Sequence, residues 1–191
     1  MAIKLINITK KFDNKVVFKD FNAHINTGKT TCIMGASGSG KTTMLRIMMG
    51  LMTPDNGQIE GLVEFKKSAI FQEDRLCENL TVTTNIKMVL QQPLAKVAVL
   101  KAIQKVGLPP DCLEQSVQQL SGGQKRRVAI LRALLADYDI LLMDEPFKGL
   151  DLETKRQVMT YVKEMTRGKT VVFVTHDSLE CDFMQDEMIY F

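Results

Sequence analysis

The chain has 191 residues and a mass of 21.5 kDa, a size that fits one domain or one domain with a small embedded subdomain. Hydrophobic residues make up 45% and charged residues 25% of the sequence, which is typical of a globular protein and argues against disorder. The net charge of +3 is too small a surplus to indicate nucleic-acid binding. The longest apolar runs, such as 140–143 and 171–174, are far shorter than the ~20 residues that cross a bilayer, so no membrane span is expected.

The cysteines are scattered along the chain at Cys32, Cys77, Cys112 and Cys181, and no Cys-x-x-Cys pair occurs. This spacing fits neither a zinc site nor a disulfide framework, so free thiols in a reducing cytoplasm are expected. The N-terminal residues 1–5 lack the long apolar segment of a signal peptide. The protein is therefore expected to stay where it is made.

Strand-like apolar runs alternate with helical patterns, which predicts an α/β domain with a mostly parallel sheet. Short antiparallel strands are expected near the N-terminus, and buried strands that alternate with helices are expected beyond them. The expected strands are residues 3–8, 16–18, 21–25, 31–34, one or two within 57–71, 139–143, 169–175 and a last one at 188–191. The expected helices are 41–49, 85–91, 94–106 and one from about 151 to 167, whose buried stripe comprises Leu152, Val158, Met159, Val162 and Met165.

Residues of about 73–120 differ in character, because they combine several prolines with helical patterns. We expect a small inserted helical subdomain here. The rest, residues 1–72 and 121–191, would form a catalytic core, and the whole chain 1–191 would be a single domain.

A glycine-rich loop follows the strand predicted at 31–34 and leads into the helix predicted at 41–49. Its residues fit the pattern G-x-x-x-x-G-K-[ST] in full: Gly35, Ala36, Ser37, Gly38, Ser39, Gly40, Lys41 and Thr42. Such a loop turns its N–H groups toward phosphate oxygens, and a helix N-terminus adds positive potential. Lys41 would reach the β- and γ-phosphates, Thr42 would ligate Mg²⁺, and Thr43 would pack or cap beside them. The alternative is a glycine-rich turn with an incidental lysine.

Two acidic residues, Asp144 and Glu145, follow the apolar run 140–143. Ligands of open α/β sheets bind at the carboxyl ends of the strands. Asp144 is therefore expected to hold Mg²⁺ beside Thr42, and Glu145 to polarise the attacking water as a general base. Taken singly, an acid after a strand is often only a helix cap or a turn former.

The segment Leu120-Ser121-Gly122-Gly123-Gln124 resembles the signature of the ABC (ATP-binding cassette) ATPases. Further elements follow the order of that family: Phe12 resembles its adenine-stacking residue, Gln72 its Q-loop glutamine, Leu150-Asp151 its D-loop and His176 its switch histidine. By residue type alone, Phe12 would be core, Gln72 a polar strand end, His176 structural and Asp151 a helix cap.

The resemblance implies a P-loop ATPase fold with an N-terminal antiparallel β-subdomain. It implies that Lys41, Gln72, Glu145 and His176 act in hydrolysis, and that Thr42, Gln72 and Asp144 surround Mg²⁺. It also implies that two cassettes, identical or paralogous, sandwich ATP. The residues expected to act on the nucleotide of the other cassette are Ser121, Gly122, Gly123, Gln124 and Asp151. Lys125, Arg126, Arg127 and Arg132 are most simply a solvated helix face that binds no nucleic acid.

The implied role is the ATPase subunit of a transporter, attached to the inner face of the cell membrane through separate permease subunits and possibly served by a substrate-binding protein. Residues 71–76 are similar to the same stretch in nitrate, sulfonate and taurine importers, which favours import of a small solute. One departure stands out: Lys148-Gly149 replaces the usual Ser-Ala of the D-loop. A soluble ABC ATPase outside transport and a non-hydrolysing nucleotide switch remain alternatives.

Overall fold

The protein is described from a computed structural model, which covers residues 2–13 and 15–191. Residues 1 and 14 of the predicted domain lie outside the described residues. The strands are β1 (Ala2–Phe12), β2 (Lys15–Asn26), β3 (Thr30–Met34), β4 (Asn56–Glu60), β5 (Lys67–Ile70), β6 (Ile140–Asp144), β7 (Thr170–Val174) and β8 (Glu187–Tyr190). The helices are α1 (Lys41–Met48), α2 (Val82–Lys87), α3 (Lys96–Lys105), α4 (Gly122–Leu135), α5 (Leu152–Met165), α6 (Ser178–Met184) and the short 3₁₀ helices η1 (Pro110–Glu114) and η2 (Val117–Gln119).

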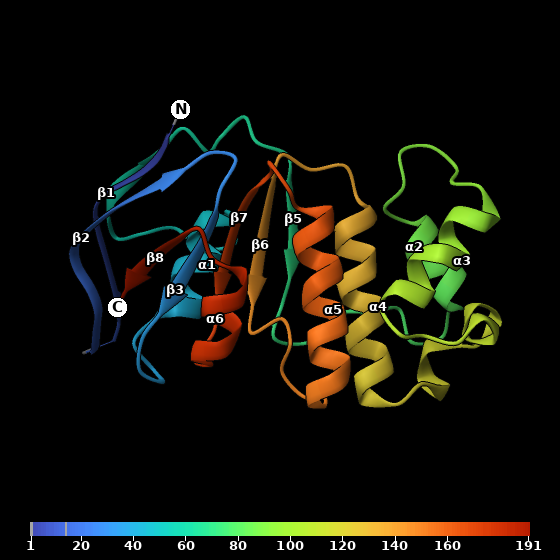
Figure 1. Cartoon of the computed structure of the whole chain (residues 1–191). Coiled ribbons are helices and arrows are strands. Elements are labelled where there is room, and N and C mark those ends of the chain that lie inside the picture. The colour runs from blue at the N-terminus through green and yellow to red at the C-terminus, as the bar shows by residue number, and fades with distance from the viewer. Residues whose placement is uncertain (1, 14) are drawn as a thin grey trace.

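Two sheets organise these elements. A five-stranded parallel sheet has the order β5-β6-β7-β3-β8, and a three-stranded antiparallel sheet has the order β2-β1-β4. The antiparallel sheet lies at one end of the molecule, and α2 and α3 lie at the other (Figure 1). The predicted α/β class, with its parallel sheet and N-terminal antiparallel part, is confirmed.

The parallel sheet is buried on both faces, and its side chains alternate between two hydrophobic cores. On β6, Leu141 and Met143 face a core that contains the apolar residues of α4, α5 and α6. Ile140 and Leu142 face the opposite core, which is filled by α1 and by the inner face of β1 and β2. Strands 140–144 and 170–174 are therefore almost wholly apolar, because neither face meets water.

The N-terminal strands are longer than expected. The predicted strands 16–18 and 21–25 are one strand, β2, which is interrupted by the positive φ of 50° at Asp20. Its pairing with β1 shifts register on both sides of Ile8, as a β-bulge does. Short sequence breaks that look like strand ends are therefore bulges within a continuous ribbon.

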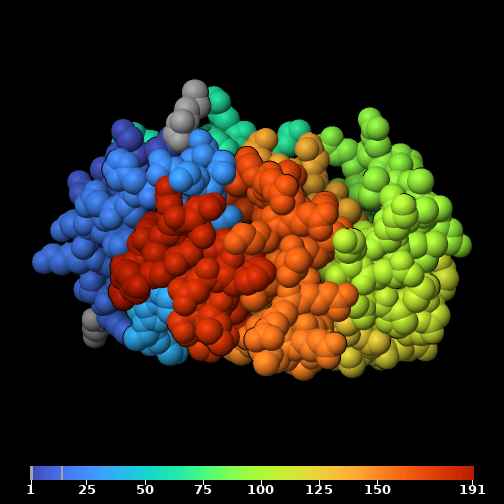
Figure 2. Space-filling view, viewed as in Figure 1, coloured from blue at the N-terminus to red at the C-terminus, as the bar shows by residue number. Residues whose placement is uncertain are grey.

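Elements between β5 and α4 are helical, as predicted for residues 73–120, and include α2, α3 and both 3₁₀ helices. Figure 1 shows α4 and α5 side by side between these helices and the parallel sheet. Figure 2 shows the same face filled in, with the C-terminal segment packed between the N-terminal strands and the α5 region. The division into a separate subdomain and core stays a prediction.

The prediction of four free thiols is wrong for two of them. Cys32 on β3 and Cys181 on α6 are joined by a disulfide, with their Cα atoms 5.9 Å apart and a sequence separation of 149. Cys32 faces the core against which α6 packs, so the fold brings the two together although their sequence spacing gives no sign of it. Cys77 and Cys112 are free.

The buried stripe predicted for α5 is also partly wrong. Val158, Met159 and Val162 are buried, but Leu152 is 60% exposed at the first turn, and Tyr161 is buried instead. The helix begins at the edge of the sheet, so its first turn projects beyond the core. No helix in the described part of the chain is long and apolar enough to cross a membrane.

Substitution of the two α5 residues tests this burial. Met159→Ala removes a side chain that is 4% exposed and should lower the free energy of unfolding by ~2–5 kcal/mol, because it leaves a cavity. Leu152→Ala is the control on the same helix and should change it by less than ~0.5 kcal/mol. Urea denaturation at constant m-value measures both. Equal losses for the two variants would contradict the assigned packing of α5.

Candidate functional site

Three loops meet at one edge of the parallel sheet because the strands that precede them are neighbours and run in the same direction. β7 lies between β6 and β3, and Val174 is level both with Ile33 and with Asp144. The glycine-rich loop after β3, the acidic pair after β6 and the segment Thr175-His176 after β7 therefore open on one cleft. This is the edge at which open α/β sheets bind ligands.

The glycine-rich loop closes around the Lys41 side chain. Gly38 and Gly40 have φ angles of 79° and 100°, which side chains rarely adopt, and a Cβ on Gly40 would also lie 2.7 Å from the ring of Phe18. The Lys41 ammonium is buried and donates to the carbonyl oxygens of Gly35 and Ala36, at 2.7 and 2.8 Å. The loop thus holds a cation at its centre without any carboxylate.

Thr42 and Asp144 lie together beside this loop. The Thr42 hydroxyl donates to Asp144 Oδ1 at 3.2 Å, across 102 residues of sequence. Burial raises the pKa of the Asp144 carboxyl, and the Thr42 hydrogen bond opposes this. A hydroxyl and a poorly compensated buried carboxylate fit a hard cation such as Mg²⁺. No group of three or more His, Cys, Asp or Glu in the described residues could hold a metal.

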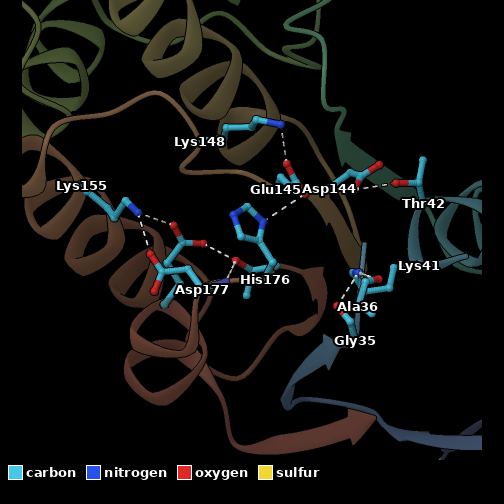
Figure 3. A network of polar contacts seen from close by, with 12 residues as sticks. Gly35, Ala36, Lys41, Thr42, Asp144, Glu145, Lys148, Lys155, His176 and Asp177 are labelled. Carbon is cyan, nitrogen blue, oxygen red and sulfur yellow. Dashed lines mark hydrogen bonds and ion pairs between the residues drawn. The ribbon is translucent and has the colours of Figure 1, made fainter. Parts of the chain in front are cut away.

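Glu145 is held from both sides. Its Oε1 is 3.2 Å from His176 Nδ1, and its Oε2 forms an ion pair with Lys148 Nζ at 2.9 Å (Figure 3). Burial raises the pKa of the Glu145 carboxyl, but Lys148 and His176 lower it by more, so the net pKa lies below the ordinary value. The lowered pKa favours the ionised carboxylate, and Glu145 is one of the residues that line the cleft.

The segment that carries His176 is braced by a small polar network. Lys155 Nζ on α5 lies 2.9 Å from Asp177 Oδ2 and 2.7 Å from Glu180 Oε1, and the Thr175 hydroxyl donates to Glu180 Oε2 at 2.6 Å. The His176 side chain itself is 65% exposed. Lys155 and Glu180 were not among the predicted site residues, because neither belongs to a motif and only the packing of α5 on α6 brings them together.

The cleft has a volume of about 510 Å³. Predicted residues that line it are Phe12, Ser37, Gly38, Gly40, Lys41, Thr42, Thr43, Gln72, Glu145 and His176. Gly35 and Ala36 support it through Lys41, and Asp144 through Thr42. Its lining also includes four residues that were not predicted: Lys15, Val17, Lys148 and Val174. Lys148 was visible beforehand only as a departure from the family pattern.

The signature residues do not line this cleft. Ser121 caps α4, accepting from the Gln124 N–H at 3.3 Å, while Gln124 Oε1 accepts from the Ser121 N–H at 2.8 Å. Ser121 and Gly122 are exposed, and a Cβ on Gly122 would meet nothing within 4 Å. Asp151 caps α5 by accepting from the Thr154 N–H at 3.0 Å. The N-terminus of α4 is thus open to another molecule.

The prediction of a solvated basic face on α4 is wrong for Arg126. Its side chain is 6% exposed and ends among backbone carbonyls beneath the cleft. Arg127 is part-buried and donates to the Gly107 carbonyl at 2.6 Å, whereas Lys125 pairs with Glu78 nearer the surface. Position 126 lies on the side of α4 that faces β6, so the Arg126 side chain enters the interior. Residue type alone does not reveal this orientation.

A strand, a glycine-rich loop closed on a lysine, and an acidic residue at the end of a parallel strand one strand away in the same sheet define a P-loop nucleotide-binding protein. The family model described as "ABC transporter" matches residues 18–148. The chain belongs to the ABC transporter family.

The similar proteins agree with this family. The chain is 36% identical to the "Spermidine/putrescine import ATP-binding protein PotA" of Acetivibrio thermocellus, over 99% of the chain and 58% of PotA. It is also 36% identical to the "Sulfate/thiosulfate import ATP-binding protein CysA" of Synechocystis sp., over 99% of the chain and 58% of CysA. The chain thus spans 58% of the length of these curated relatives.

Solved structures show the same fold. The dimeric post-hydrolysis state of the ATP-binding cassette MJ0796 with ADP and Pi superposes with a TM-score of 0.84 and 32% identity, covering 98% of this chain and 93% of that one. A second dimeric structure of MJ0796, described as a bacterial ABC transporter cassette, gives a TM-score of 0.83. The fold is that of ABC ATPase cassettes.

The ion pairs of Lys155 with Asp177 and Glu180 should make the stability of the fold depend on pH. Lys155 lowers the pKa of Asp177, so the pair stabilises the fold fully above the unfolded pKa of about 3.9 and loses this effect as the pH falls through the lower folded pKa. Burial lowers the pKa of Lys155, but Glu180 and Asp177 raise it by more, so the net pKa is raised. The contribution of Lys155 to the free energy of unfolding is therefore lost only above about pH 10. The stability difference between wild type and Lys155→Ala should therefore be constant from about pH 5 to 10 and shrink below about pH 4.

Urea midpoints measured across this pH range test the expectation. Arg156→Ala is the control, since Arg156 is exposed on the same helix and should give a small difference at every pH. A Lys155→Ala difference that stays constant down to about pH 2 would contradict the assigned pair.

Proposed function

We propose that the chain binds ATP with Mg²⁺ and hydrolyses it as the energising subunit of an ABC importer. One observation carries the proposal: the ammonium of Lys41, the Thr42–Asp144 pair and the Glu145–His176 pair surround one cleft at the carboxyl ends of adjacent strands. Hydrolysis of a phosphoanhydride needs groups that bind the phosphates, hold the metal and take the proton of water, and these residues suit those three tasks. The cassette fold and the family match support the same conclusion.

The loop residues would bind the phosphates, with Lys41 exchanging its two carbonyl partners for phosphate oxygens. Phe12, which is 44% exposed at the rim of the cleft, would stack on the adenine. Thr42 and Asp144 would hold Mg²⁺, and Gln72, which lines the same cleft, would reach it. When bound, the metal would neutralise charge on the phosphate oxygens.

Glu145 would accept a proton from the attacking water, because it is ionised and directed into the cleft. In the structure both of its oxygens are engaged, by His176 and Lys148. The exposed His176 can turn from Glu145 toward a γ-phosphate. The chain's own residues would thus bind the phosphates, orient the nucleotide and take the proton of the attacking water.

A second cassette would complete each site. The exposed N-terminus of α4, with Ser121, Gly122, Gly123 and Gln124, lies outside its own cleft and can approach a nucleotide bound to a partner. Asp151, which begins α5, would lie at the same contact. The dimeric cassettes of MJ0796 support a homodimer, and a paralogous partner is the second possibility.

Membrane permease subunits would supply the transport pathway, and the cassette would lie on the inner face of the membrane. The named relatives serve spermidine and putrescine, which are cations, and sulfate and thiosulfate, which are anions. Similarity of the cassette therefore does not select the cargo. Residues 71–76 favour the importers of nitrate, sulfonate and taurine, with a substrate-binding protein as a further component.

Glu145→Gln tests the enzyme. The amide cannot take the proton of water, so kcat should fall ~10²–10⁴-fold while ATP binding is kept and an ATP-bound dimer accumulates. Phosphate release, nucleotide titration and size-exclusion chromatography measure the three effects. Glu153→Gln, an exposed charge loss on α5, is the control and should hydrolyse at the wild-type rate.

Two outcomes would reject this assignment. Normal turnover by Glu145→Gln would remove Glu145 as the base. Wild type that binds Mg-ATP without any turnover, even with its membrane partner, would favour the non-hydrolysing switch.

Leu80→Glu tests the permease contact. Leu80 lies in the segment 73–85 after Gln72, is 37% exposed, and would face the membrane subunits. The membrane subunits encoded beside the cassette are co-expressed with it. The charge should lower the amount of cassette that co-purifies with them ~10-fold, because burying an unpaired charge costs affinity. Val97→Glu on α3, 61% exposed, is the control. A soluble ATPase outside transport would co-purify with no such subunit.

A further inference from the structure

Arg126 places one guanidinium where three functional segments meet. Its Nε donates to the Pro146 carbonyl at 2.7 Å, and its Nη2 donates to the carbonyls of Glu145 at 2.6 Å and Asp144 at 3.2 Å. Its Nη1 donates to the Phe71 carbonyl at 2.6 Å and pairs with Asp74 Oδ1 at 3.2 Å. One side chain from α4 thus holds the turn after β6 and the segment around Gln72.

The turn after β6 needs such a partner. Glu145 has a φ of 46°, a left-handed conformation that is unfavourable for a residue other than glycine. Its N–H donates to the Val174 carbonyl at 2.9 Å, which ties the turn to β7. The three successive carbonyls of Asp144, Glu145 and Pro146 point the other way, toward Arg126. The guanidinium therefore fixes the backbone that aims the Glu145 carboxylate.

The segment around Gln72 is held by the same group. The Phe71 carbonyl, directly before Gln72, makes one of the two shortest bonds of Arg126. Gln72 and Glu145 both line the cleft, whereas Arg126 does not. The distance between the two functional side chains is thus set through a residue that does not line the cleft and whose side chain is almost wholly buried.

Only arginine has the shape for this task. A guanidinium carries five N–H donors in a rigid plane, so it can bridge groups on different sides. A lysine ammonium is one atom on a flexible stem and cannot span both segments. A glutamine amide has two donors.

We propose that Arg126 is a positioning residue for hydrolysis, which sets the Glu145 turn and the Gln72 segment relative to each other. This rests on the proposed function. Arg126 acts through Glu145 and Gln72 and does not contact the reacting atoms.

Arg126→Lys and Arg126→Gln test the proposal, with Arg127→Lys as the matched control. Arg127 is the next residue on α4 and also donates to backbone carbonyls, but those of Gly107 and Gly123, outside the cleft. Both Arg126 variants should lower kcat ~10- to 100-fold while the Kd for ATP changes less than ~3-fold, because the P-loop is untouched. Arg127→Lys should keep kcat within ~3-fold.

A double-mutant cycle separates positioning from general damage. If Arg126 acts through Glu145, Arg126→Lys should cost less than ~3-fold in a Glu145→Gln background. Equal losses in both backgrounds would overturn the proposal, as would wild-type kcat in Arg126→Lys. Asp74→Asn keeps the arginine and weakens one of its contacts, so it should lower kcat in the same direction but by less. This variant replaces the Arg126 variants if they do not fold.

Amide hydrogen exchange gives a readout that does not need turnover. Arg126→Lys should speed exchange within 71–74 and 144–148 and leave 41–48 unchanged. Unchanged exchange in the first two segments would overturn the positioning role. A wild type without turnover would instead overturn the proposed function, and exchange would then decide the positioning on its own.

Discussion

The parallel pairing of β3, β7 and β6 is the constraint on which the whole site depends. Because the three strands are adjacent and run the same way, the loops that follow them open at one edge of the sheet. Val174 is level with both Ile33 and Asp144, which sets the Lys41 loop opposite the acidic pair. A slip of one residue would exchange the two faces of a strand and send its apolar side chains to the wrong core, so the alternating burial of β6 and β7 protects the site geometry.

The site holds its cations with backbone carbonyls. Lys41 is bound by the carbonyls of Gly35 and Ala36, and Arg126 by those of the turn after β6 and of Phe71. Buried charges need partners, and these carbonyl dipoles supply them without engaging the Asp144 carboxylate. Asp144 consequently has only the Thr42 hydroxyl as its side-chain hydrogen-bond partner among the described residues, which is the state that suits a metal ligand.

In this structure the residues of the site are assembled, and the N-terminus of α4 is exposed. Glu145 is held between His176 and Lys148, and the capped N-terminus of α4 is open rather than folded onto its own cleft. Lys148 stands where the family commonly has a serine, and it forms an ion pair with Glu145 within its own chain. The segment with His176 is braced by Lys155, Asp177 and Glu180, so the backbone of this exposed histidine is held in place.

The sequence by itself determined the elements whose signals are local. The glycine-rich loop, the apolar run before Asp144 and the order of the motifs predicted the sheet, the cleft and most of its lining, because each depends on backbone freedom or on burial within a few residues. Tertiary structure alone decided the burial of Arg126, the pairing of Lys148 with Glu145, the Lys155 brace, the exposure of Leu152 and the joining of Cys32 to Cys181. These depend on which segment packs against which, and residue type carries no record of a neighbour that lies far along the chain.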